Sequence, residues 1–264
     1  MTGFIGCGNM GRAIIKGIIE KGLVSREKII ASAASDLTKK YISEELKIGL
    51  AADNREVVEK SDLIFFAVKP QILEMVISEI KDIDISGKTF VSMSPGKTFD
   101  WFNARFGRPA ALVRTAPNTA LSIGEGMTAV CGNPLVAPAR LDTVTEIFSC
   151  LGLTVSVEEK LLDIVLALGG SSPAFAYMFI EALADGAVAE GMPRALAYKI
   201  AAQAVAGSGK MVLESGKNPA MLKDEVASPG GTTIEGINTL EDSAFRSAAM
   251  NAVRSCIRKA ERMK

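Results

Sequence analysis

The sequence predicts an α/β protein with an N-terminal Rossmann-type doubly wound sheet and an all-helical C-terminal domain. Two observations support this prediction. In the first part of the 264-residue chain, short β-branched apolar runs alternate with helical periods, which is typical of a parallel sheet with helices on both faces. After residue 158 the runs give way to long helical periods punctuated by proline or glycine. We therefore expect two domains, residues 1–158 and 159–264.

The individual elements follow from these patterns. Strands are predicted at Thr2–Ile5, Lys28–Ser32, Leu63–Val68, Thr89–Met93, Ala111–Thr115, Met127–Val130 and Thr154–Val157. Helical periods separate the early strands, notably at Met10–Lys21 and Leu37–Leu46. In the second domain we expect helices at about Lys160–Leu168, Pro173–Glu190, Pro193–Glu214, Pro219–Ala227, Thr232–Glu241 and Ala244–Met263. Three of these begin at a proline, which the first helical turn tolerates.

The charge balance and the missing histidine exclude several classes of function. The chain has 30 Lys and Arg against 30 Asp and Glu, so it lacks the basic field that a nucleic-acid partner requires. It has no histidine, which excludes a Ser/His/Asp triad, a His-ligated zinc and a His general acid. We expect neither a metal site nor a nucleic-acid partner.

Cysteine usage and hydropathy favour a soluble cytoplasmic protein. No CxxC pair occurs, and we expect reduced thiols at all four cysteines, Cys7, Cys131, Cys150 and Cys256. Met1 is followed almost at once by a predicted strand, which leaves no room for a signal peptide. The longest uncharged stretch, Ile164–Ile180, is interrupted by Gly169–Pro173, so no membrane span is expected.

The composition of the second domain predicts a dimer. Between Pro173 and Gly209 the chain has 12 Ala and 4 Gly with few charges. Helices that are apolar nearly all round must be buried, and a domain of this size hardly surrounds them alone. We expect a second subunit to bury them, which makes the C-terminal part a dimerisation domain. The alternative is an alanine-rich core within a monomer.

A glycine-rich turn predicts dinucleotide binding. Gly6, Gly8 and Gly11 form G-x-G-x-x-G directly after the first predicted strand and at the start of a helix. The first glycine permits a tight turn, the second lets the backbone approach a diphosphate, and the third lets the helix pack on the strand. Asn9 and Met10 complete the turn, whose free N–H groups would face the diphosphate. The alternative is a structural glycine turn.

The residues after the second strand favour NADP(H), with NAD(H) as the alternative. An NAD-binding protein usually places a carboxylate there to hold the adenosine ribose, but no carboxylate occurs before Asp36. The hydroxyls of Ser32 and Ser35 suit a 2′-phosphate better. Loop signals at three further strand ends predict backbone along the nicotinamide, at Ala67-Val68-Lys69-Pro70, Ser94-Pro95-Gly96 and Thr115-Ala116-Pro117-Asn118.

The missing proton donors favour reduction of a C=N bond. Reduction of a carbonyl requires a group that protonates the alkoxide, such as His, a Tyr–Lys pair or Lys. The chain has no histidine, its tyrosines lack the Y-x-x-x-K spacing, and no lysine lies between Lys160 and Lys199. An iminium ion already carries its proton and accepts a hydride directly.

A second glycine pair predicts a carboxylate site. Gly230 and Gly231 follow Ser228 and precede Thr232, where a helix is predicted to begin. Backbone N–H groups in such a turn form a nest for an anion, and the Thr233 hydroxyl is placed to bond a substrate nitrogen. The alternative is an ordinary turn between helices with threonine as its N-cap.

Taken with their order along the chain, these segments resemble pyrroline-5-carboxylate reductases. The resemblance lies in Ser228-Pro229-Gly230-Gly231-Thr232-Thr233-Ile234 with the residues around it, and in the Gly6–Gly11 turn, Ala67–Pro70, Pro117-Asn118 and Gly169–Ala174. It implies NAD(P)H-dependent reduction of 1-pyrroline-5-carboxylate to L-proline, the last step of proline biosynthesis. It also implies a Rossmann domain and a helical domain that interlocks into homodimers, often assembled into decamers.

The resemblance also implies roles for particular residues. Ser228 and the amides of Gly231 and Thr232 would hold the carboxylate, and Thr233 would act as the catalytic residue by bonding the ring nitrogen. Asn54 would hold the adenosine end, and Ala67, Lys69 and Pro70 would lie along the cofactor. Pro95 departs from the family pattern. Two alternatives stay open: a reductase of another imine or β-hydroxyacid-type substrate, and a non-catalytic NADP-binding module.

Overall fold

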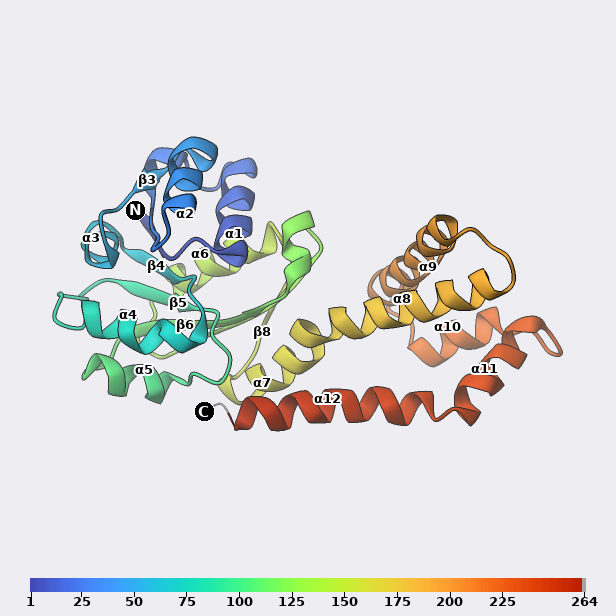
Figure 1. Ribbon diagram of the computed structural model, residues 1–264. Helices are drawn as coiled ribbons and strands as arrows, with labels where there is room; N and C mark the ends of the chain where they lie inside the picture. The colour runs from blue at the N-terminus through green and yellow to red at the C-terminus, as the bar shows by residue number, and fades with distance from the viewer. Residues whose placement is uncertain (263–264) are drawn as a thin grey trace. The chain divides into compact units, whose positions relative to one another are not determined.

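The computed structural model describes residues 1–262, which form two compact units (Figure 1). The first unit contains Met1–Gly170 and the described residues from Ile257 onward. The second contains Ser171–Cys256. The first unit extends past the boundary predicted at residue 158 because the helix α7 (Leu162–Val165) packs against strands of the sheet and buries Leu162.

The first unit is built on one eight-stranded sheet, in the order β3-β2-β1-β4-β5-β6-β7-β8. Its strands are β1 (Thr2–Ile5), β2 (Ile29–Ser32), β3 (Gly49–Leu50), β4 (Leu63–Phe66), β5 (Thr89–Ser92), β6 (Ala111–Pro117), β7 (Gly126–Gly132) and β8 (Gly152–Ser156). Each predicted strand is present. The short edge strand β3 was not predicted, and β7 runs antiparallel to β6 because only the short turn around Thr119–Ile123 joins them.

Helices cover both faces of the sheet (Figure 1). One face carries α1 (Asn9–Glu20), α2 (Asp36–Lys40) and α6 (Pro138–Ser149), and the other carries α3 (Asn54–Lys60), α4 (Leu73–Ile80) and α5 (Phe99–Phe106). Short 3₁₀ and π segments complete this unit at Arg26–Lys28, Tyr41–Leu46, Pro70–Ile72, Thr119–Ile123, Glu159–Leu161 and Leu166–Ser171.

The strands bury both of their faces, as a parallel sheet between two helical layers requires. Phe4 and Phe65 stack at 4.7 Å between ring centroids beneath α1 and α6. Phe66 and Phe90 stack at 5.4 Å in the opposite layer, where Phe66 also stacks on Phe102 at 5.9 Å. Successive residues of one strand therefore serve different cores, which explains why the strands read as continuous apolar runs. The doubly wound fold predicted from the sequence is confirmed.

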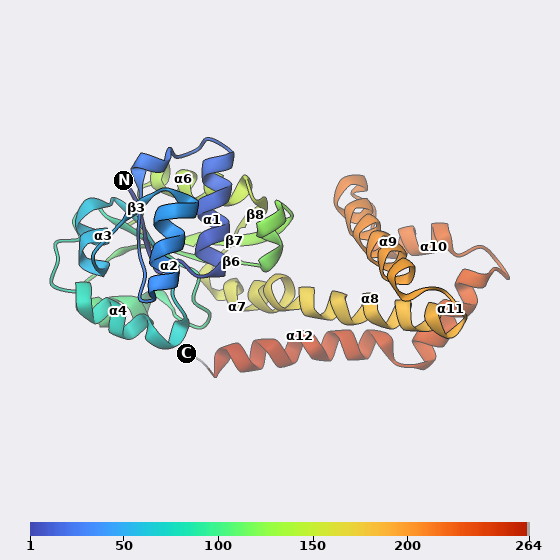
Figure 2. The ribbon, with the colours of Figure 1, turned by 45° about the horizontal axis from the view of Figure 1, so that its top comes forward.

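The second unit is entirely helical, as predicted. It contains α8 (Ser172–Ala189), α9 (Arg194–Ser215), α10 (Pro219–Val226), α11 (Thr232–Asp242) and most of α12 (Phe245–Glu261). The helices α8 and α12 run alongside each other in both views (Figures 1 and 2), and Phe179 meets Phe245 at 5.7 Å.

The helices of the second unit leave most of their apolar surface exposed within one chain. All residues of this unit are described, and only Ala184, Ala197 and Ala201 are buried. Met178 and Leu213 are 68% and 70% exposed. Monomeric proteins rarely leave a large contiguous apolar patch uncovered, so these helices need a partner surface.

The expected break at Gly169–Pro173 is not present. A π-helical segment, Leu166–Ser171, absorbs the glycines and passes directly into α8, so Glu159–Ala189 is one helical run of 31 residues. By length and composition alone this run is apolar enough to cross a membrane, with a mean hydropathy of 1.4 and 17% of its window buried. The prediction that Gly169–Pro173 interrupts this stretch is therefore wrong.

The first testable prediction concerns Gly152, which pairs with Gly126 across β7 and β8. Its φ is +142°, and a Cβ built there would lie 2.0 Å from the Gly126 carbonyl oxygen. Gly152→Ala adds backbone strain to a clash with main chain, and we expect it to lower the free energy of unfolding by about 2–5 kcal/mol. Urea unfolding followed by the fluorescence of Trp101, the single tryptophan, measures this.

Gly107 provides the matched control. Its φ is +67°, but a Cβ there meets nothing within 4 Å. Gly107→Ala should therefore cost only the left-handed strain of about 1–2 kcal/mol. Equal losses for the two variants would show that the close approach of Gly152 to Gly126 does not constrain the fold.

Candidate active site

The glycine-rich turn is shaped by its contact with the end of β4. Gly6 has a φ of +87°, and a Cβ there would lie 2.6 Å from the Val68 side chain and 2.9 Å from the Ala67 carbonyl oxygen. A Cβ on Gly11 would lie 2.9 Å from that of Ala67. The first and third glycines thus allow the turn and α1 to pack against β4.

The second glycine leaves a cradle open. A Cβ on Gly8 would have no neighbour closer than 3.9 Å, so its absence keeps open space rather than relieving a clash. Gly8 is the N-cap of α1, and within the described chain no side chain caps this helix. The backbone N–H groups of the first turn, from Asn9 to Gly11, are therefore available to an anion. These residues fit the diphosphate of a dinucleotide.

A cleft of about 380 Å³ adjoins this turn and brings together residues distant in sequence. Gly6, Ser32, Asn54 and Val68, all expected from the sequence to bind cofactor, line it. Ser32 is buried and donates its hydroxyl hydrogen to Asn54 Oδ1 at 2.6 Å. The dimensions and the polar floor suit the adenosine end of a dinucleotide.

Glu79 also lines this cleft, although nothing in the local sequence indicates it. Its carboxylate accepts a hydrogen bond from Asn54 Nδ2 at 2.6 Å. The lack of a carboxylate after β2 favours NADP(H), yet α4 supplies a carboxylate to the same cleft from another part of the chain. Only the tertiary fold reveals it.

Ser35 and Lys69 lie at the exposed ends of the loops predicted to hold cofactor. Ser35 caps α2 by accepting a hydrogen bond from the Thr38 amide at 3.3 Å, and its hydroxyl also bonds the Thr38 hydroxyl at 2.9 Å. Lys69 is exposed, and Pro70 begins the 3₁₀ segment that follows β4. These positions leave their polar groups accessible at the carboxyl ends of β2 and β4.

Asn118 is committed to holding the backbone. Its Oδ1 accepts from the amides of Ala120 and Met127, each at 3.2 Å, and its Nδ2 donates to the Gly169 carbonyl oxygen at 3.0 Å. The side chain thus ties the end of β6 to the π-helical segment. Its backbone N–H also donates within the fold, to the Met127 carbonyl oxygen at 3.2 Å.

Gly96 is buried in the turn after β5 and has a φ of +71°. This left-handed conformation favours glycine and gives a physical reason for its position beside the predicted nicotinamide loop.

A buried cation lies beneath these loops. Arg114 on β6 is 5% exposed, and its Nη1 donates to Glu159 Oε1 at 2.8 Å. The same carboxylate oxygen accepts from the Phe99 amide at 2.7 Å, and Asp163 lies 3.9 Å from Arg114 Nη2. Removing one partner would leave a buried charge unpaired, so this cluster fixes the loops after β5 and β6. Sequence inspection did not identify it.

The thiols of the first unit are poor nucleophiles. Burial raises the pKa of the Cys7 thiol above its usual value, although Arg12 opposes this shift. Burial also raises the pKa of Cys131 and of Cys150. A thiolate is the reactive form, so these cysteines stay neutral near pH 7. Among residues 1–262 no group of three or more His, Cys, Asp or Glu gathers where a metal would bind.

The second glycine pair forms a turn at the start of α11. Gly230 has a φ of +67°, and the Gly231 amide donates to the Ser228 carbonyl oxygen at 3.0 Å. A Cβ on Gly231 would lie 2.5 Å from the Ser228 hydroxyl oxygen. Gly231 is the N-cap and, in the described structure, no side chain caps α11. The amides of Thr232 and Thr233 are therefore available to a carboxylate.

We predict that Asn118 stabilises the fold through its three side-chain hydrogen bonds, to the Ala120 and Met127 amides and to the Gly169 carbonyl oxygen. Asn118→Ala leaves two amides and one carbonyl group unpaired, and it should lower the free energy of unfolding by about 1–3 kcal/mol. Asn118→Asp keeps the acceptor for the two amides but places a carboxylate oxygen against the Gly169 carbonyl oxygen, so its loss should be at least as large. Urea unfolding checks both. Wild-type stability in either variant would contradict this role.

Comparisons with known proteins agree with this geometry. A family model described as pyrroline-5-carboxylate reductase dimerisation matches residues 159–263, and one described as NADP oxidoreductase, coenzyme F420-dependent, matches residues 1–96. The chain is 44% identical over 261 residues to the pyrroline-5-carboxylate reductase of Escherichia coli, covering 99% of this chain and 97% of that relative. It is 42% identical over 262 residues to that of Methanosarcina acetivorans, covering 99% and 96%.

Solved structures give the same result. The Plasmodium falciparum pyrroline carboxylate reductase with NADP bound superposes with a TM-score of 0.90 at 32% identity, covering 99% of this chain and 97% of that one. A pyrroline-5-carboxylate reductase from Coxiella burnetii gives a TM-score of 0.92 at 30% identity, covering 100% and 98%.

Proposed function

The chain belongs to the pyrroline-5-carboxylate reductase family, and on that premise we propose how its residues carry out the reaction. It reduces 1-pyrroline-5-carboxylate to L-proline with NADP(H) as the cofactor. The observation that carries the assignment is the 44% identity with such a reductase over 99% of this chain. The two uncapped helix starts, of α1 and α11, are local features that suit an anionic cofactor and an anionic substrate. Reduction of another imine or of a β-hydroxyacid-type substrate is not favoured, because the relatives that match 99% of this chain are pyrroline-5-carboxylate reductases.

The cofactor is held by the first unit. Gly6, Gly8 and Gly11 with the amides of Asn9 and Met10 bind the diphosphate. Ser32, Ser35 and Asn54 bind the adenosine end, where Val68 also lines the cleft. Ala67, Lys69, Pro70, Gly96 and Asn118 lie along the nicotinamide half. When bound, NADPH supplies the hydride. NADH is the alternative donor.

The substrate is held by the turn before α11. Ser228 and the amide of Thr232 bind the carboxylate, and Gly230 permits the turn. The Gly231 amide joins them by giving up its hydrogen bond to the Ser228 carbonyl oxygen. The helix dipole of α11 stabilises the anion by about 0.3–1 kcal/mol at an exposed site, and by up to about 2 kcal/mol when partly buried. Backbone donors hold the acid in one orientation without a cationic side chain.

Thr233 orients the ring nitrogen. Its side chain is half-buried on the first turn of α11, adjacent to the amides that hold the carboxylate. The protonated C=N group of the substrate already carries the proton that the amine product keeps, so the site needs no strong acid. This explains how a chain without histidine reduces its substrate.

We predict that loss of the Thr233 hydroxyl lowers kcat by about ten- to hundredfold. This loss lies at or below the low end of the rate factors, about 10²–10⁴-fold, that positioned acid–base groups contribute. Thr233→Val keeps the shape of the side chain and should show this loss, whereas Thr233→Ser should restore much of the activity. The consumption of NADPH with 1-pyrroline-5-carboxylate measures both.

Thr239→Val is the control for that series, because the Thr239 hydroxyl on the same helix bonds the Glu235 carbonyl oxygen at 3.1 Å. It should keep wild-type kcat. Unchanged kcat and KM in Thr233→Val would reject the role of Thr233. An inactive wild-type enzyme would reject the assigned reaction.

We also propose that a second copy of the chain, rather than a bilayer, covers the apolar faces of α8 and α9, and that the dimers assemble into a cytoplasmic decamer. The family model for dimerisation matches this part of the chain. We predict that size-exclusion chromatography with light scattering gives a dimer or a multiple of dimers, and that the protein does not float with lipid vesicles. A monomer at micromolar concentration, or co-flotation, would contradict the proposal.

A further inference from the structure

Arg12 joins the two loops that hold the cofactor. Its Nε donates to the Cys7 carbonyl oxygen at 2.9 Å, within the glycine-rich turn. Its Nη2 donates to the Thr38 hydroxyl at 3.3 Å, on α2. The guanidinium carbon lies 4.1 Å from the centre of the Tyr41 ring, which holds it in place. One half-buried cation is therefore anchored between α1 and α2.

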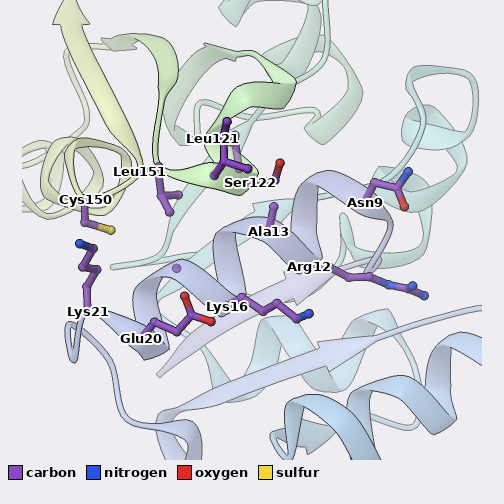
Figure 3. A pocket seen from close by; sticks show the side chains of 13 residues that line it. Asn9, Arg12, Ala13, Lys16, Glu20, Lys21, Leu121, Ser122, Cys150 and Leu151 are labelled. Carbon is purple, nitrogen blue, oxygen red and sulfur yellow. The ribbon is translucent and has the colours of Figure 1, made fainter. Parts of the chain in front are cut away.

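The charge of Arg12 has no carboxylate partner among residues 1–262. The groups that Arg12 contacts are neutral: a carbonyl, a hydroxyl and a phenol ring. Arg12 and Lys16 line a cleft of about 580 Å³ together with Leu121 and Leu151, and Figure 3 shows the two cationic side chains extending from α1 away from these leucines. A guanidinium with five N–H donors and two described hydrogen bonds keeps donors for an anion.

The anchors of Arg12 adjoin the adenosine cleft. Cys7 follows Gly6, which lines that cleft. Thr38 shares a hydrogen bond with Ser35, which follows the cleft residue Ala34. The guanidinium thus stands where the diphosphate turn and the β2–α2 loop come together. An adenosine 2′-phosphate bound at Ser35 would be within reach of it.

Glu79 acts on the same cleft with the opposite sign. A carboxylate only accepts hydrogen bonds, so the Asn54 group that faces Glu79 is the NH₂ and the group that faces Ser32 is the carbonyl oxygen. Ser32 then donates its hydrogen to Asn54 and presents lone pairs to the cleft. Those lone pairs accept a hydrogen bond from a ribose 2′-hydroxyl but none from a phosphate, so the Ser32 hydroxyl does not suit the 2′-phosphate as its position in the sequence suggests.

We propose that Arg12 and Glu79 set the choice between NADPH and NADH in opposite directions. Arg12 binds the 2′-phosphate of NADPH, and Glu79, acting through Asn54 and Ser32, favours the free 2′-hydroxyl of NADH. This inference rests on the proposed use of a nicotinamide dinucleotide. Arg12 outweighs Glu79 because it reaches the phosphate directly, whereas Glu79 acts through a neutral amide. The sequence gives no hint of the pair, since both side chains come from outside the β2–α2 loop.

The test compares two fragments of the cofactor that differ at the 2′ position. Adenosine 2′,5′-bisphosphate and adenosine 5′-diphosphate are titrated into the full-length protein by calorimetry, so that no turnover is needed. Arg12→Gln should weaken binding of the bisphosphate by at least about tenfold, as expected for a charge-assisted hydrogen bond, and change binding of the diphosphate by less than about threefold. Glu79→Gln should tighten binding of the bisphosphate by about two- to fivefold.

Two further variants distinguish binding of the 2′-phosphate by Arg12 from a purely structural role in holding the two loops together. Arg12→Lys keeps the charge and should retain part of the preference for the bisphosphate. Lys16→Gln removes a cation one turn along α1 that also faces Tyr41, at 5.6 Å, but has no described bond to either loop, and it should change neither affinity by more than about threefold. Equal losses for both fragments in Arg12→Gln would show that Arg12 only braces the loops, and would overturn the proposal.

Kinetics complete the test and keep this inference distinct from the assigned reaction. The ratio of kcat/KM for NADPH to that for NADH, with 1-pyrroline-5-carboxylate as substrate, should fall in Arg12→Gln and rise in Glu79→Gln. A ratio that stays at the wild-type value in both variants would overturn the inference while the reaction stands. A wild-type enzyme that turns over neither cofactor would overturn the reaction itself.

Discussion

The close approach of the glycine-rich turn to the end of β4 is the constraint on which the rest of the site depends. Side chains at Gly6 or Gly11 would collide with Ala67 or Val68 at distances below 3 Å. Because nothing separates the two segments, α1 begins immediately above the sheet and directs its uncapped N–H groups at the space beyond the carboxyl ends of the strands. β1 lies between β2 and β4, where the strand order changes direction, and this is the switch point at which doubly wound sheets bind ligands.

From that point the remaining features of the cofactor site extend outward. Asn54 spans from β2 toward α4, and Arg12 spans from α1 to α2, so each loop around the cleft is held by a side chain from another element. On the other side, Asn118 and Arg114 fix the loops after β5 and β6 to the helical run that begins at Glu159. The cleft is thus positioned by long-range polar contacts on a rigid apolar sheet rather than by its own loops.

The sequence predicts the features of the site that depend on neighbouring residues, but it does not predict the contacts between residues distant in sequence. The glycine turn, the strand runs and the turn before α11 are each determined by neighbouring residues, and the sequence predicts them. Glu79 could not be found, because its carboxylate reaches the adenosine cleft only after α3 and α4 have packed together. The three hydrogen bonds of the Asn118 side chain to backbone groups are likewise invisible in the sequence, and its predicted contact with the cofactor stays a prediction. The glycines at Gly169 and Gly170 read as a break, but a π-helical turn accommodates them. The orientation of β7 depends on a pairing that no periodicity reports.

The chemistry follows from what the chain lacks as much as from what it contains. With no histidine in the chain, we propose that the enzyme relies on a substrate that brings its own proton. We also propose that it binds two anions at two uncapped helix starts, the diphosphate at α1 and the carboxylate at α11. A crystal structure of the protein with NADP⁺ and L-proline tests this claim most directly. The diphosphate oxygens should lie within hydrogen-bond distance of the amides of Asn9–Gly11, and the proline carboxylate should lie on the Thr232 amide, with the Gly231 amide turned to it from the Ser228 carbonyl oxygen. A proline carboxylate held instead by a cationic side chain, with the turn before α11 empty, would contradict it.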